Sequence, residues 1–76
     1  MMDNAEKLRS IANEIPSKKA ILLSATQPIL HPLINLSMDM IENVIRNTDI
    51  PDTEDASERL NQLNGLINQF MKVCLR

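Results

Sequence analysis

Apolar residues recur at three- and four-residue spacing through much of the chain, which predicts amphipathic helices. The strongest pattern is an a/d heptad seam near the C-terminus, formed in order by Ala56, Leu60, Leu63, Ile67, Phe70 and Cys74. Acidic residues cluster where this segment begins, and Lys72 and Arg76 stand at its end. That charge order suits the dipole of a helix. The pattern therefore predicts a helix over about 53–75.

A second wide apolar face predicts a helix over about 32–47. Its apolar residues keep helical spacing and are Leu33, Ile34, Leu36, Met38, Met40, Ile41, Val44 and Ile45. Pro32 suits the first helical position, because its missing N–H needs no partner there. The turn residues and Pro51 that follow predict a loop before the last helix.

The prolines divide the N-terminal part of the chain. Asp3 with Glu6 three residues later predicts a helix start, and Ile15-Pro16 predicts its end, giving a helix over about 3–14. Ser17 is then the predicted N-cap of a second helix over about 18–26. Apolar residues are nearly continuous there, so periodicity leaves 20–31 open between helix and extended chain. Helix is favoured because no partner strand is found elsewhere.

These segments predict an all-α fold, a single domain over residues 1–76. We expect a small bundle of three to four helices built around an antiparallel hairpin of the last two. Phe70 is the one aromatic residue and Gly65 the one glycine, too few of either for a β-sandwich or barrel. The N-terminus lacks the features of a signal peptide, and prolines and polar residues interrupt the longest uncharged run. We therefore expect a cytoplasmic protein without membrane insertion.

The sequence contains few candidate catalytic residues. His31 and Cys74 are each alone in their residue type and lie on different segments. No third group that would orient such a pair is evident. A single thiol forms neither an intramolecular disulfide nor a cysteine metal cluster, and it suits a reducing compartment. The sequence predicts no catalytic residue, no cofactor and no enzyme activity.

Four acidic residues at three-residue spacing are candidate ligands for a calcium ion; they are Asp49, Asp52, Asp55 and Glu58. An EF-hand loop needs ligands at alternating positions and a central glycine. Pro51 interrupts this stretch, which also contains no glycine. Helix capping explains the acids without an ion, so we predict no metal site.

Basic residues offer two further interpretations. Arg9, Lys18 and Lys19 form a small basic patch, whereas a DNA reader needs a concentrated basic face. A membrane-surface helix over Lys18–Leu23 would lack an aromatic anchor. A small dimeric DNA-associated transcriptional regulator, contacting phosphates through these three residues, is kept as the alternative function.

The excess of apolar residues favours association with another chain. A domain of 76 residues buries a small share of its surface and is marginally stable alone. Exposed apolar patches usually mark interaction surfaces, although the first two segments can also cover the excess within one monomer. We predict a non-enzymatic protein–protein interaction module, an adaptor, inhibitor or chaperone-like protein that masks a partner surface and forms a homodimer. Its predicted interface residues are Leu60, Leu63, Leu66, Ile67, Phe70, Met71, Val73, Cys74, Met40, Ile41 and Val44.

Overall fold

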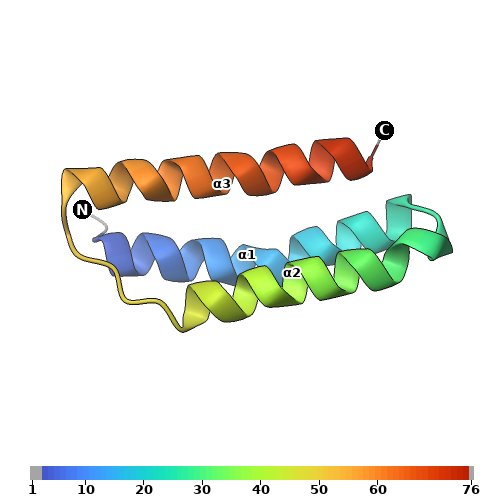
Figure 1. Ribbon diagram of the computed structural model, residues 1–76, viewed down its shortest axis with the longest axis horizontal. Coiled ribbons are helices and arrows are strands. Elements are labelled where there is room, and N and C mark those ends of the chain that lie inside the picture. Colours follow the sequence, from blue (N-terminus) through green and yellow to red (C-terminus); the bar gives the residue numbers. More distant parts are fainter. Residues whose placement is uncertain (1–2, 76) are drawn as a thin grey trace.

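Residues 3–75, the part of the chain that the computed structural model describes, form three α-helices and one short 3-10 helix. The elements in chain order are α1 (Asn4–Ala25), η1 (Pro28–Leu30), α2 (His31–Arg46) and α3 (Glu54–Cys74). No strand occurs within these residues. Figure 1 shows the three long helices running side by side along the longest axis of the molecule. The all-α prediction is confirmed.

The helix α1 is continuous where the sequence predicted two helices. The predicted break at Ile15-Pro16 is wrong, and so is the predicted N-cap at Ser17, because both lie inside α1. A proline in a helix interior removes one backbone hydrogen bond. Burial on both sides of Pro16 offsets this loss, since Ile15 and Leu22 are almost completely inaccessible to solvent. Tertiary packing therefore overrides the local signal of the proline.

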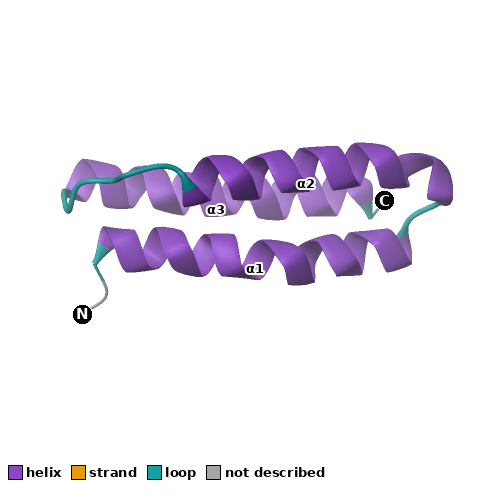
Figure 2. Cartoon of the chain, turned by 90° about the horizontal axis from the view of Figure 1, so that it is seen from below, coloured by secondary structure: helices purple, strands orange, loops and turns teal. Residues whose placement is uncertain are grey.

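Polar contacts give the relative directions of the helices. Lys7 Nζ donates to Ser57 Oγ and Lys18 Nζ to Asn68 Oδ1, each at 3.1 Å, and both pairs lie fifty residues apart. A constant separation means that α1 and α3 run parallel. Lys19 of α1 pairs with Asp39 of α2, and the earlier Asn13 meets the later Arg46, so α2 returns antiparallel to α1. Both views agree with this up-down-up arrangement (Figures 1 and 2).

The helix α1 is the element that packs against both other helices. The expected centre, a hairpin of the last two helices, is therefore replaced by a bundle arranged around α1. The reason is the length of α1: a helix of 22 residues carries a longer apolar stripe than the two short pieces expected from the sequence. The buried core draws on all three helices and comprises Leu8, Ala12, Ile15, Leu22, Ile34, Met38, Ile45, Leu60 and Ile67.

Side chains cap two of the helices. Asp3 is the N-cap of α1, as predicted, and its Oδ1 accepts from the N–H of Glu6 at 2.7 Å. Thr53 is the N-cap of α3, where its Oγ1 accepts from the N–H of Ala56 at 3.2 Å. Pro32 lies in the first turn of α2, which begins one residue earlier than expected. The segment left open, 20–31, is helical to Ala25 and then forms the turn η1.

Candidate interaction surface

The predicted interface residues fall into three groups by burial. Leu60 and Ile67 are 3% and 2% exposed and belong to the core of the monomer. The half-buried group packs against that core and comprises Ile41, Leu63, Phe70, Met71 and Cys74. The exposed group comprises Met40, Val44, Leu66 and Val73, with exposed fractions of 58%, 63%, 64% and 59%. The heptad seam thus faces inward, whereas Leu66 and Val73, which flank it, face solvent.

An apolar groove runs between α2 and α3. We call it the α2/α3 groove and define it by its lining residues, Leu8, Met40, Ile41, Val44, Ile45, Thr48, Ile50, Arg59, Leu60 and Leu63. Its volume is about 430 Å³. The side chains of α2 and α3 form its walls, with α1 contributing Leu8. The structure therefore brings together Met40, Ile41 and Val44 with Leu60 and Leu63, five of the predicted interface residues.

Both rims of the groove continue as apolar rows along their helices. On α2, Leu33, Met40 and Val44 are seven and four residues apart and are all exposed. On α3, Leu66 and Val73 follow Leu63 at three- and seven-residue steps, so they lie on the same side of the helix. The apolar surface beside the groove is therefore longer than the groove itself.

Arg59 is the one charged residue among those lining the groove. It is exposed and makes no ion pair within residues 3–75. The acidic residues of α2 are engaged elsewhere: Asp39 Oδ1 lies 2.8 Å from Lys19 Nζ of α1, and Glu42 Oε2 lies 2.8 Å from Arg46 Nε. The groove is thus aliphatic with one unmatched positive charge at its rim.

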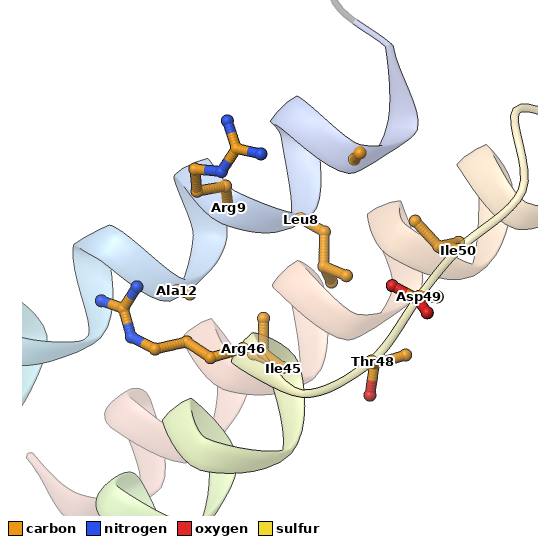
Figure 3. A pocket seen from close by; sticks show the side chains of 9 residues that line it. Leu8, Arg9, Ala12, Ile45, Arg46, Thr48, Asp49 and Ile50 are labelled. Atoms are coloured by element: carbon orange, nitrogen blue, oxygen red, sulfur yellow. The ribbon is translucent and has the colours of Figure 1, made fainter.

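A second hollow, of about 490 Å³, lies between α1 and the end of α2 (Figure 3). It shares four residues with the α2/α3 groove, Leu8, Ile45, Thr48 and Ile50, and adds Ala5, Arg9, Ala12, Arg46 and Asp49. The guanidinium of Arg46 is already occupied by Glu42 and, at 3.3 Å, by Asn13 Oδ1. This hollow therefore has a mixed polar and apolar lining.

The candidate catalytic pair is not joined in the structure. His31 Nε2 lies 3.3 Å from the carbonyl oxygen of Thr26, at the corner between α1 and α2. Cys74 is half-buried at the end of α3 and packs against the core. Across residues 3–75 no hydrogen bond connects these two side chains. His31 and Cys74 therefore do not form a hydrogen-bonded nucleophile–base pair.

Of the four acidic residues considered for calcium binding, Asp52 has a structural partner. Asp52 Oδ1 accepts from the backbone N–H of Asn4 at 2.9 Å and so serves the start of α1. Among the residues that the structure describes, no three His, Cys, Asp or Glu side chains group together as a metal site.

The three basic residues considered for DNA binding do not form one free patch. Lys18 Nζ lies 3.5 Å from Glu14 Oε2, and Lys19 is paired with Asp39. Arg9 is exposed on α1, about nine residues and therefore roughly 14 Å away along the helix axis. Contact with phosphate would require the two lysines to give up their present partners.

The segment considered for membrane-surface binding contributes to the core. Leu22 is fully buried and Leu23 packs against the core, whereas Ile21 is exposed. No helix within residues 3–75 combines the length and the apolar character needed to cross a bilayer.

Sequence reasoning missed several groove residues, namely Leu8, Ile45, Thr48, Ile50 and Arg59. Helical periodicity identifies which residues share a face, but it does not say which helices become neighbours. No sequence signal distinguished Arg59 from other exposed charges. No family model, curated protein or solved structure matches this chain. The assignment of function rests on the geometry of the chain alone.

Proposed function

We propose that the protein is a non-enzymatic interaction module that covers an apolar surface of another protein with the face formed by α2 and α3. The observation that carries this proposal is the α2/α3 groove, which is aliphatic and flanked by the exposed side chains of Met40, Val44, Leu66 and Val73. Clustered exposed apolar side chains usually mark interaction surfaces. The single thiol, Cys74, suits the reducing cytoplasm as the place of action.

The proposal includes a homodimer of the free protein through the same face. A chain of 76 residues has a small core, and pairing would cover apolar side chains that the monomer leaves in water. The broad side of the molecule measures 40 by 21 Å. The area of that side is comparable to the roughly 800 Å² that each partner buries in a standard interface. Two-fold assemblies are the commonest form of self-association.

The test compares the protein with Val44→Glu, which places a charge on the exposed rim of α2. A matched control is Ile21→Glu, because Ile21 is a similarly exposed aliphatic residue on α1, outside the groove. Sedimentation equilibrium over a wide concentration range should give a dimer for the wild type and the control. Val44→Glu should be monomeric while its helical circular dichroism and thermal midpoint stay near the wild-type values.

Affinity capture of proteins from the native host on the immobilised protein is the second measurement. Proteins retained by the immobilised wild type should be retained by Ile21→Glu and lost with Val44→Glu. A wild type that is monomeric at high micromolar concentration would disprove the homodimer. If, in addition, Val44→Glu retained the same proteins as the wild type, the proposed interaction face would be wrong.

A further inference from the structure

We infer that the α2/α3 groove receives one amphipathic helix from a different protein, and that a carboxylate on this helix pairs with Arg59. This inference rests on the proposed function and names the kind of partner. It follows from three properties of the groove, namely its shape, its lining and its charge.

The shape of the groove matches a missing helix of a bundle. Both α2 and α3 accompany α1, and the space between them is open to solvent and lined by both helices together with Leu8 of α1. A helix placed there would contact two neighbours at once, as each helix does in a four-helix bundle. Since α2 has 16 residues, the occupant that spans it is about 16 residues and roughly 24 Å long.

The lining specifies the contact face of that helix. The rims present Met40 and Val44 from α2 and Leu63 from α3, and the exposed Leu66 follows Leu63 just beyond the groove. A helix lying in a groove inserts apolar residues at i, i+3 or i+4, and i+7. Methionine adapts its shape readily, so Met40 tolerates different side chains opposite it. The occupant therefore needs an aliphatic stripe and no particular aromatic anchor.

The charge decides between a foreign helix and a second copy. Arg59 lines the groove without an ion pair inside residues 3–75, while Asp39 and Glu42 of α2 are paired away from it. A second copy of the groove would bring another arginine and no lining carboxylate. A foreign helix with Glu or Asp beside its apolar stripe supplies the missing partner. Charge complementarity therefore favours the foreign helix, with the homodimer as its competitor for the same face.

The test uses two synthetic 18-residue helical peptides with leucine at heptad positions a and d. One peptide carries glutamate at the flanking e and g positions, and the other carries lysine there. Fluorescence anisotropy at low ionic strength measures the Kd of each for the full chain. The net charge of the protein is −2, so long-range attraction alone would favour the lysine peptide. We expect the glutamate peptide to bind about fivefold more tightly, because its carboxylates meet Arg59.

Four variants locate the effect. Arg59→Gln should remove the advantage of the glutamate peptide, and Arg59→Glu should make the lysine peptide the tighter ligand. Arg9→Glu, which changes an exposed arginine outside the groove, should leave the preference intact. Val44→Glu should weaken both peptides at least tenfold, since a charge on the rim opposes an apolar stripe. Circular dichroism of each variant checks that the fold is retained.

Failure of this inference differs from failure of the proposed function. If the glutamate peptide binds no more tightly than the lysine peptide, or if Arg59→Glu changes nothing, the acidic helix is the wrong partner. The same conclusion follows if neither peptide binds the folded protein. In each case a homodimer that Val44→Glu disrupts would leave the interaction face standing, with a second copy as its occupant.

Discussion

The backbone N–H of Asn4 donates a hydrogen bond to Asp52 Oδ1 at 2.9 Å, joining the first turn of α1 to the loop that precedes α3. The side chain of Asn4 reinforces this connection, because its Nδ2 donates to the carbonyl oxygens of Pro51 and Thr53 at 2.9 and 3.0 Å. Asn4 is 6% exposed, so the donor side of these part-buried bonds is shielded from water. A buried polar side chain stabilises a fold when its hydrogen bonds are made. This residue therefore fixes the loop on which the start of α3 depends.

Replacing Asn4 with alanine should destabilise the protein by about 1–3 kcal/mol, because two loop carbonyls lose their donor. Urea unfolding followed by circular dichroism measures the change. Asn35→Ala is the matched control, since Asn35 is exposed on α2 and makes no side-chain hydrogen bond within the described residues. Its free energy of unfolding should stay within about 0.5 kcal/mol of the wild type. Equal effects of the two substitutions would disprove the anchoring role of Asn4.

Asp52 and Thr53 should contribute separately, since they cap different helices. Asp52 accepts from Asn4 at the start of α1, and Thr53 accepts from Ala56 at the start of α3. Replacing both with alanine should lower the free energy of unfolding by about 1–2 kcal/mol. Calcium should leave the thermal midpoint of the wild type unchanged, because the carboxylate of Asp52 already accepts from the backbone N–H of Asn4. A saturable rise in that midpoint with calcium would contradict capping as the role of Asp52.

The α1–α2 hairpin shows how far local sequence reasoning extends. The N-cap at Asp3 and the place of Pro32 in the first turn of α2 follow from side-chain chemistry close in sequence, and the structure has both. The continuity of α1 through Pro16 does not follow from it. That continuity depends on Ile15 and Leu22 being buried by other helices, and these neighbours are distant in sequence.

The sequence likewise predicts one property of the interaction surface and not another. The apolar character of Met40, Val44 and Leu66 is evident from the sequence, because each lies on a wide apolar helix face. Their separation from Leu60 and Ile67, which are buried, depends on which sides of α2 and α3 are turned toward α1. Helical periodicity fixes positions around one helix axis and does not say which side faces a neighbouring helix. The core and the exposed rim therefore could not be distinguished before the fold was known.

Pro16→Ala should stabilise the protein. Pro16 is exposed in the interior of α1 and cannot donate the backbone hydrogen bond that alanine would restore. The difference in helix propensity between proline and alanine reaches about 3 kcal/mol, from which the greater chain entropy of the unfolded alanine variant subtracts about 1 kcal/mol. We expect a net gain of roughly 2 kcal/mol, measured as a higher urea midpoint with an unchanged slope. A loss of stability would mean that α1 needs the local geometry imposed by the proline.

Asn64→Leu should also stabilise the protein. The Oδ1 atom of Asn64 is buried and has no hydrogen-bond partner within residues 3–75. Leucine has a similar size and removes an unsatisfied acceptor, for which we expect a gain of about 1 kcal/mol. Asn61→Leu provides the comparison, because Asn61 is exposed on the same helix. If the two substitutions changed the free energy of unfolding equally, burial of the amide oxygen would not be the cause.

Substitutions of Ile67 and Phe70 should distinguish effects on folding from effects on association, because the two residues lie on one helix and differ in burial. Ile67 is 2% exposed, so Ile67→Ala leaves a cavity and should cost about 2–5 kcal/mol of unfolding free energy. Phe70 is half-buried and packs against the core from its edge. Phe70→Ala should therefore cost less than the roughly 3–5 kcal/mol of a fully buried phenylalanine.

Urea unfolding measures both costs, and sedimentation equilibrium below the unfolding transition measures the dimer. Per kcal/mol of stability lost, Phe70→Ala should weaken the dimer more, since its ring is partly accessible to a partner. The opposite order, with Phe70→Ala costing more stability than Ile67→Ala and leaving the dimer intact, would place Phe70 in the core and outside the interaction face.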